Sequence, residues 1–376
     1  MSVARIIGIS LLLNVSCGTP QTDSKVATAN PPHSPHKGPW FEGWYARVID
    51  LGGSRSIAVI AASHLPKEEN FVPNGDMPGY VGVLYSEGNG SPTQSWTFFP
   101  DKTRIQSDGK WVTQNPNIFS KNDAPFKWEA DGLGSFRSDG LSLHVPGEID
   151  LEMKFGESKS WEASDFAFPL GPEGYLAVLP VPLHWYVESL ASPTSYSVKI
   201  GQGETIEGRG LAHLEKNWGQ VFPKAWNWLQ GLSVTDDAQI VLGGGAVGLG
   251  PVNLNAWLAG YRSPKENWTI RFSDPLTKIT TEQDPCAGEF HFRAKRPGLE
   301  IEIDAKASPD TFGPVAVPTQ DGFVANNGAE SFSATLVVKT YRVHFNGREL
   351  TEERTFPNAA LEFGAGSYCA LLTEPK

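Results

Sequence analysis

The sequence predicts an all-β protein in which two antiparallel β-barrel or sandwich halves pack together. At 376 residues, 40% of them apolar, the chain exceeds one small domain and can build a large core. Its 39 glycines and 29 prolines leave no long apolar-periodic segment for a helical bundle. Instead, about sixteen short alternating or apolar runs are separated by Gly, Pro, Asn and Asp, a density typical of all-β sandwiches and barrels.

The overall charge is acidic. There are 42 acidic and 31 basic residues, giving a net charge of −11, and no block of five or more like charges occurs. Without a positive field to attract phosphates, nucleic acid is not predicted as a partner.

Residues 1–17 have the features of a signal peptide. Arg5 precedes an apolar run over 6–13, which is too short to span a bilayer. Cys17 follows the small residue Ser16 as in a lipobox, although Asn14 stands where leucine is usual. We therefore expect an exported lipoprotein, periplasmic or on the cell surface, held to the membrane by lipid on Cys17. The alternative is plain secretion with cleavage nearby.

The body of the chain follows a polar linker. Residues 18–39 are rich in Thr, Ser, Pro, Asn and Lys, the composition of a flexible tether. A weak internal repeat then relates 40–50 to 226–236, each with Trp first, Val ninth and Asp last. A repeat of this kind is expected from two barrels with equivalent opening strands. We expect one half over 40–190 and the other over 191–376.

The opening strand places a carboxylate on an apolar face. With a period of two, Glu42 shares its face with Trp44, Ala46 and Val48. Burial there would raise the pKa of Glu42 toward that of a general acid. The alternative is that Glu42 pairs with an Arg or Lys and that Trp44 plugs the barrel floor.

A second constellation lies over 211–230. In an extended segment His213, Glu215 and Asn217 form a polar row, and Trp226 and Trp228 of the next strand form an aromatic wall. Such a wall can stack on a planar ring or pack along an isoprenoid chain. The alternative is that the tryptophans only fill the core.

The remaining histidine, motif and cysteine patterns limit the classes of reaction that the sequence supports. His184 alternates with Tyr186 and Glu188 on one strand face, where a lone histidine is more often structural than catalytic. No metal is predicted, because no zinc spacing is present, and no nucleophile elbow, phosphate loop or dinucleotide motif is found. With Cys17 set aside, Cys286 and Cys369 are an even pair that can form a disulfide in an oxidising compartment or remain two separate thiols.

Four motifs resemble the tocopherol cyclase family. They are FEGWY at 41–45, PVPLHW at 180–185, EKNWG continuing into FPKAWNW over 215–228, and LEFG at 361–364. These motifs occur in the family's order along the body. Segments 64–165 and 235–355 have no counterpart that we can match residue by residue.

The resemblance implies a double lipocalin-like fold and cofactor-free closure of a prenylated quinol to a chromanol. On that basis Glu42 or Glu215 is the expected proton donor or base. The expected pocket walls are Trp44, Trp218, Trp226 and Trp228, and the residues expected to orient the quinol are Tyr45, His184 and Asn217. Two alternatives stay open: hydration of an isoprenoid double bond, and binding of a lipid or isoprenoid without catalysis.

Overall fold

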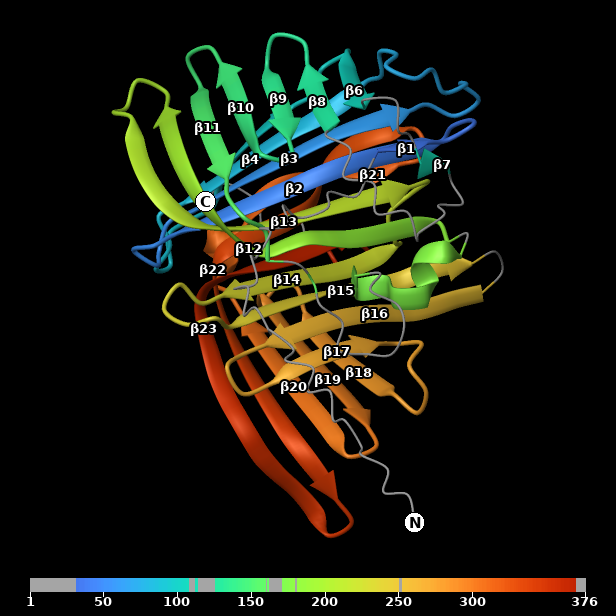
Figure 1. Cartoon of the computed structure of the whole chain (residues 1–376), viewed down its shortest axis with the longest axis vertical. Coiled ribbons are helices and arrows are strands. Elements are labelled where there is room, and N and C mark those ends of the chain that lie inside the picture. Colours follow the sequence, from blue (N-terminus) through green and yellow to red (C-terminus); the bar gives the residue numbers. More distant parts are fainter. Residues whose placement is uncertain are drawn as a thin grey trace, which may run out of the picture.

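A computed structural model describes residues 32–107, 112–113, 126–159, 161, 171–179, 181–249 and 252–369, and these are built almost entirely from strands (Figure 1). The described helical segments are two 3₁₀ turns, η1 (Gly171–Val178) and η2 (Pro309–Thr311). None of the described segments is a helix long and apolar enough to span a bilayer. The predicted signal peptide, Cys17 and residues 18–31 of the predicted tether lie outside the described residues.

The first sheet contains eleven strands in the order β5-β4-β3-β2-β13-β12-β11-β10-β9-β8-β6. Its neighbouring strands are antiparallel. Its strands are β2 (Trp40–Asp50), β3 (Ser56–Leu65), β4 (Gly79–Ser86), β5 (Gln94–Phe98), β6 (Thr103–Ser107), β8 (Phe126–Ala130), β9 (Gly134–Arg137), β10 (Gly140–Val145), β11 (Ile149–Phe155), β12 (Leu183–Ile200) and β13 (Ile206–Gly219). A short parallel pair, β1 (His33–Ser34) and β7 (Val112–Thr113), lies apart from it.

The second sheet contains ten strands, with β21 added beside β22 to the order β17-β16-β15-β14-β23-β22-β20-β19-β18. Its strands are β14 (Ala225–Leu232), β15 (Gln239–Leu249), β16 (Val252–Arg262), β17 (Asn267–Arg271), β18 (Lys278–Asp284), β19 (Glu289–Arg296), β20 (Leu299–Lys306), β21 (Gly313–Thr319), β22 (Gly322–His344) and β23 (Gly347–Ala365). The prediction of an all-β chain made of two antiparallel halves is therefore confirmed.

The two sheets have equivalent topologies, which accounts for the internal repeat. In each, the opening strand lies mid-sheet, with the next strand of the chain on one side and the last strand on the other: β3 and β13 flank β2, and β15 and β23 flank β14. The predicted division at residue 190 falls inside β12, and the chain passes between the sheets after Gly219. Strand β12 is continuous over Leu183–Ile200, with register shifts between Val187 and Ser192.

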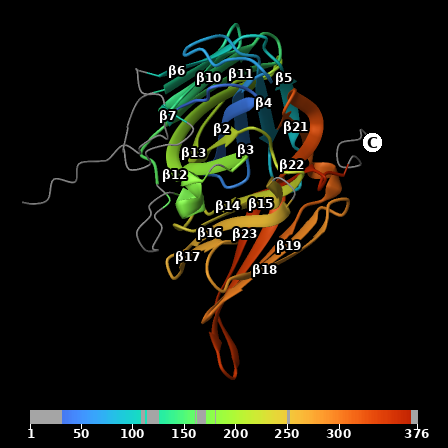
Figure 2. The same cartoon turned by 90° about the vertical axis from the view of Figure 1, so that its right-hand side faces the viewer.

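The alternation of side chains along the strands produces three apolar layers. Trp44, Ala46 and Val48 pack inside the curved first sheet, while Leu229 packs inside the second. Residues of opposite parity, such as Tyr45 on β2 and Trp228 on β14, point into a third cluster between the sheets. A cavity lies in this middle layer, where the two sheets stack in Figures 1 and 2.

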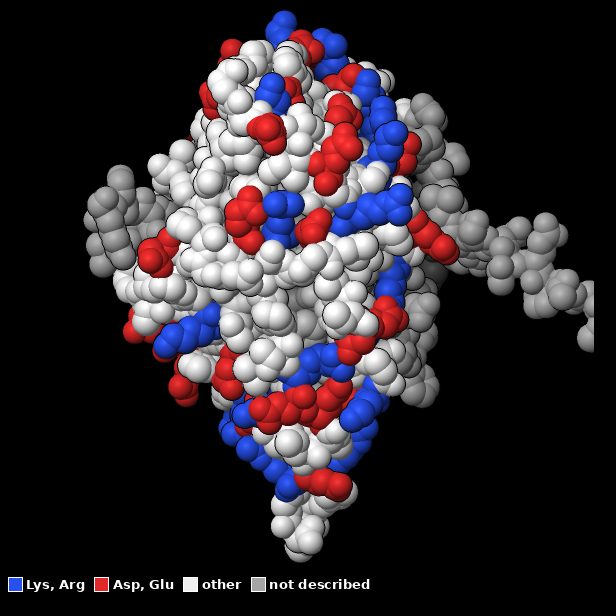
Figure 3. Space-filling model, turned by 90° about the vertical axis from the view of Figure 1, so that its left-hand side faces the viewer, with Lys and Arg blue, Asp and Glu red and all other residues white. Residues whose placement is uncertain are grey.

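The surface carries charges of both signs. On the face shown in Figure 3, Lys and Arg side chains are interspersed with Asp and Glu. That face therefore offers no extended field of one sign.

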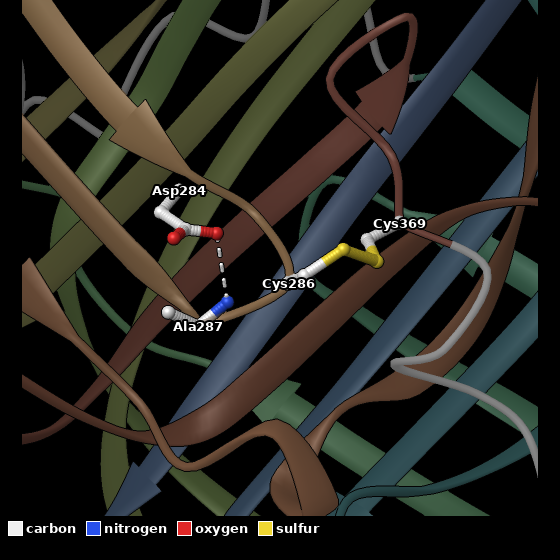
Figure 4. Close-up of a disulfide and its surroundings, with 4 residues drawn as sticks. All are labelled: Asp284, Cys286, Ala287 and Cys369. Atoms are coloured by element: carbon white, nitrogen blue, oxygen red, sulfur yellow. Dashed lines mark hydrogen bonds between the residues drawn. A yellow bond between two sulfur atoms is a disulfide. The ribbon is translucent and has the colours of Figure 1, made fainter.

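A disulfide between Cys286 and Cys369 ties the end of the second sheet to the turn after β18 (Figure 4). The Cα atoms are 5.4 Å apart and the sequence separation is 83 residues. The turn is further fixed by the Ala287 backbone N–H, which donates to Asp284 Oδ1 at 3.1 Å.

Replacing Cys286 with Ala is expected to lower the free energy of unfolding by about 2–4 kcal/mol, because the unfolded chain loses a long covalent loop. Denaturant titration with and without reductant measures this. Reductant should bring the wild-type protein down to the stability of Cys286→Ala and leave the variant unchanged. Two reactive thiols in unfolded, non-reduced protein would contradict the bridge.

Candidate functional site

A cavity of about 220 Å³ lies between the two sheets and is closed on one side by η1. Strands β2, β3, β4, β12 and β13 supply the wall from the first sheet, and β14, β15, β16, β21, β22 and β23 supply it from the second. The wall is mostly apolar. Its hydroxyl, amide and carboxyl side chains are Tyr45, Tyr80, Glu173, Glu215, Asn217, Asn227 and Glu362.

Glu215 enters the cavity from β13 and is held by two N–H donors. His213 Nε2 lies 2.9 Å from Glu215 Oε2, and the Trp228 indole N–H donates to the same oxygen at 3.1 Å. His213, Glu215 and Asn217 share this face of β13, as the alternation of the sequence predicts. These two contacts fix the position of the Glu215 carboxyl group on the cavity wall.

Glu362 enters the same cavity from β23 of the second sheet. Its Oε1 accepts one hydrogen bond, from the Trp226 indole N–H at 2.8 Å. Burial raises the pKa of Glu362 to about 7, the Trp226 hydrogen bond opposes the rise, and the nearby charge of Glu215 adds to it. The cavity therefore holds two carboxyl groups with different hydrogen-bond partners, and the raised pKa suits Glu362 to keep its proton.

A third carboxyl group lies behind Tyr45. The Tyr45 hydroxyl donates to Glu330 Oε1 at 2.7 Å, and Glu330 is fully buried. Burial and the charge of Glu362 hold the pKa of Glu330 well above its ordinary value. The buried Arg47 lies nearby and donates to Ser56 Oγ at 2.9 Å and to the Asn358 carbonyl at 2.6 Å. This network fixes the orientation of the Tyr45 ring on the cavity wall.

Glu173 of η1 has a positioning role. Its Oε1 accepts the Trp185 backbone N–H at 2.7 Å, and its Oε2 lies 2.9 Å from His184 Nδ1. Arg271 of β17 donates to the Pro172 carbonyl at 2.8 Å. Both sheets therefore hold η1 against the cavity.

The aromatic wall predicted from the sequence faces the cavity. Trp226, Trp228 and Trp185 all line it. Tyr45 meets Trp228 edge to face at 5.2 Å, and Phe222 meets Trp226 in the same way at 5.0 Å. Three indole rings and a phenol thus surround the space beside the two carboxyl groups, an arrangement that can stabilise a positive charge.

Glu42 lies on the opposite face of β2, inside the first sheet. It is 1% exposed, and its Oε1 is 2.5 Å from Lys216 Nζ and 3.0 Å from His33 Nδ1. Burial would raise the pKa of Glu42, but the charge of Lys216 and the contacts of His33 hold it below its ordinary value. The structure therefore realises the ion-pair alternative, and Glu42 is an ionised group outside the cavity wall.

Three other predicted residues are directed into the first sheet. Trp218 stacks between His33 and His184, with ring centroids 4.4 and 5.2 Å away. Neither Trp218 nor His184 lines the cavity. Trp44 borders it, but its ring stacks on Phe126 at 4.7 Å inside the first core. Of the predicted site residues, the cavity wall thus brings together Trp44, Tyr45, Glu215, Asn217, Trp226 and Trp228.

Sequence reasoning did not single out Glu362, Glu330 or Glu173. Glu362 lies in the LEFG motif, and its placement two residues after buried Ala360 on one face of β23 was a usable signal. Nothing local distinguishes Glu330, because its burial follows from β22 packing under Tyr45. Within the part of the chain that the structure describes, no three His, Cys, Asp or Glu side chains are placed to hold a metal ion.

Residues 173–365, just over half of the chain, match the pattern of the tocopherol cyclase-like family. The chain belongs to this family. The match spans η1, the second sheet, and the strands that carry Glu215 and Glu362. The family prediction made from the four motifs is confirmed. No curated protein matches the chain in sequence.

Several solved structures are similar to the chain at low identity, and the first of them shows the same fold. CghA, solved with Sch210972, is 12% identical with a TM-score of 0.53, over 89% of this chain and 94% of that one. A protein assigned as AttH from Nitrosomonas europaea is 13% identical with a TM-score of 0.45, over 86% and 92%. Kievitone hydratase from Nectria haematococca is 9% identical with a TM-score of 0.46, over 92% and 94%.

Proposed function

We propose that this protein closes a prenylated quinol to a chromanol inside the cavity between its sheets. The observation that carries the proposal is the pair Glu215 and Glu362, two carboxyl groups in unlike environments on one tryptophan-lined apolar wall. Membership of the tocopherol cyclase-like family supports the same chemistry.

The first step is protonation of the alkene by Glu362. The proton moves from the carboxyl group to the less substituted alkene carbon. The other alkene carbon becomes a tertiary carbocation. A carboxyl with a pKa of about 7 still carries its proton near neutral pH. The π-faces of Trp226, Trp228 and Trp185 stabilise the cation, and the apolar wall excludes the water that would quench it.

The second step is ring closure. The phenol oxygen attacks the cation, a carbon–oxygen bond forms, and the phenol proton passes to the Glu215 carboxylate. Transfer of that proton back to Glu362 restores the starting state, so the reaction is an isomerisation that needs no oxidant or cofactor. Tyr45 and Asn217 lie on the same wall and orient the quinol hydroxyl groups.

We also propose that the protein is exported and anchored through Cys17. The Cys286–Cys369 disulfide supports an oxidising compartment. A lipid anchor would hold the cavity near a membrane, where prenylated quinols dissolve.

Incubation with a prenylated benzoquinol tests the activity. A chromanol product, detected by mass and by loss of the alkene signal, is the expected result, and Glu215→Gln should form it far more slowly. A tertiary alcohol would replace the proposal with hydration. Recovery of bound but unchanged quinol would replace it with a lipid-binding role.

The rate of cyclisation is expected to fall as the pH rises through about 7, because Glu362 must be protonated to act. Trp226→Phe should move the midpoint of this fall to higher pH, since the indole N–H lowers the pKa of Glu362. Initial rates at a saturating quinol concentration measure both effects. A rate that rises across this range would remove Glu362 as the acid.

A further inference from the structure

One end of the cavity is walled by aromatic side chains from both sheets. Tyr80 of β4 and Phe323 of β22 line it, with ring centroids 5.5 Å apart, and Phe99 stacks on Tyr80 at 5.7 Å. Exposure rises outward, from 2% at Tyr80 to 47% at Phe99. Tyr80, Phe323 and Phe99, the aromatic mouth, form an apolar path from the cavity wall to the surface.

The surface of the aromatic mouth consists mainly of carbon atoms. The Tyr80 hydroxyl accepts the Ala316 backbone N–H of β21 at 3.3 Å, so this polar atom is used within the wall. Strand β21 packs beside β4 and β5 at this place, as Figure 2 shows. The aromatic mouth is apolar although it opens to solvent. Such a surface is unusual for a water-filled entrance and suits the binding of a hydrocarbon chain.

The cavity is too small to enclose a whole prenylated quinol, so part of the ligand must extend out of it. Its volume of about 220 Å³ lies below the ~300–1,000 Å³ usual for pockets that enclose a whole small molecule. In the first sheet the mouth strand β4 is separated from β13, which carries Glu215, by β3 and β2. At ~4.8 Å per strand the distance is about 14 Å, which is enough for a ring and its reacting isoprene unit.

We propose that the isoprenoid tail of the substrate leaves the cavity through the aromatic mouth, and that Phe99 determines the affinity for long tails. This inference rests on the proposed function, since it takes the quinol ring to lie between Glu215 and Glu362. The ring and first isoprene unit fill the cavity, and the later units lie across Tyr80 and Phe99 to the surface.

Binding of prenylated benzoquinones with one to four isoprene units tests the proposal. The quinone has no phenol proton, so it binds without cyclising, and quenching of tryptophan fluorescence reports its affinity. Wild-type affinity should rise with tail length, because each unit buries apolar surface. Phe99→Asp should weaken binding of the four-unit quinone by about tenfold or more and leave the one-unit quinone unchanged.

Leu276→Asp is the matched control. Leu276 is 81% exposed and lies after β17, outside the aromatic mouth. This variant should bind all four quinones as the wild type does. Loss of long-tail affinity in Leu276→Asp alone, or equal affinity for all tail lengths in the wild type, would overturn the proposal. Quinone binding is measured without turnover. The affinities therefore test the path of the tail even if no chromanol forms in the cyclisation assay.

Discussion

Glu362→Gln is expected to reduce cyclisation by about 10²–10⁴-fold, the usual contribution of a general acid. The amide has the shape of the protonated carboxyl and can still accept the Trp226 indole N–H, but it cannot supply the proton. Chromanol formation per enzyme, together with quinone binding, measures the effect. Binding should change little, because the apolar wall is intact.

The same variant should gain stability at alkaline pH. The pKa of Glu362 is raised from 4.5 to about 7 in the folded protein, so the folded state binds this proton more tightly than the unfolded state. The stabilisation is complete below the ordinary pKa and is lost as the pH rises through about 7. Glu362→Gln should therefore unfold at a higher temperature than the wild type at about pH 8, and at a similar temperature near pH 4.

Glu215→Gln is the comparison variant for the effect on stability. The charge of Glu215 adds to the rise in the pKa of Glu362, but burial is the larger cause, so Glu215→Gln should bring a smaller alkaline gain than Glu362→Gln. A Glu362→Gln variant that cyclises at the wild-type rate would show that the proton comes from another group.

The contrast between Glu215 and Glu42 shows what the sequence could predict. Alternation placed Glu215 beside His213 and Asn217, and put Glu42 on the face of Trp44, and the structure has both arrangements. Each strand, however, has two buried faces here, one inside its own sheet and one between the sheets. The sequence does not indicate which of these two faces holds a cavity.

The contacts that the sequence could not predict depend on pairing between strands far apart in the chain. Lys216 lies opposite Trp44 on β2 and so reaches Glu42, a contact that depends on β13 pairing with β2 across the whole first half. Glu362 reaches Glu215 only because two sheets stack.

Lys216→Met is expected to destabilise the fold by about 3–5 kcal/mol, the effect of leaving a buried charge without its partner. Lys216 is 0% and Glu42 1% exposed, and their charged atoms are 2.5 Å apart. Urea titration at neutral pH measures the loss. The double variant Glu42→Gln with Lys216→Met should recover much of it, since neither charge remains.

The pH dependence separates this effect from a simple packing defect. In the wild type the pKa of Glu42 is held below its ordinary value by Lys216 and His33, so its stabilisation is present at neutral pH and is lost as the pH falls through the folded pKa. In Lys216→Met burial dominates and raises that pKa, so acid should stabilise the variant. The difference in unfolding free energy should therefore narrow between about pH 7 and pH 4. A constant difference would mean that Lys216 acts through its packing on Trp44 and Trp218.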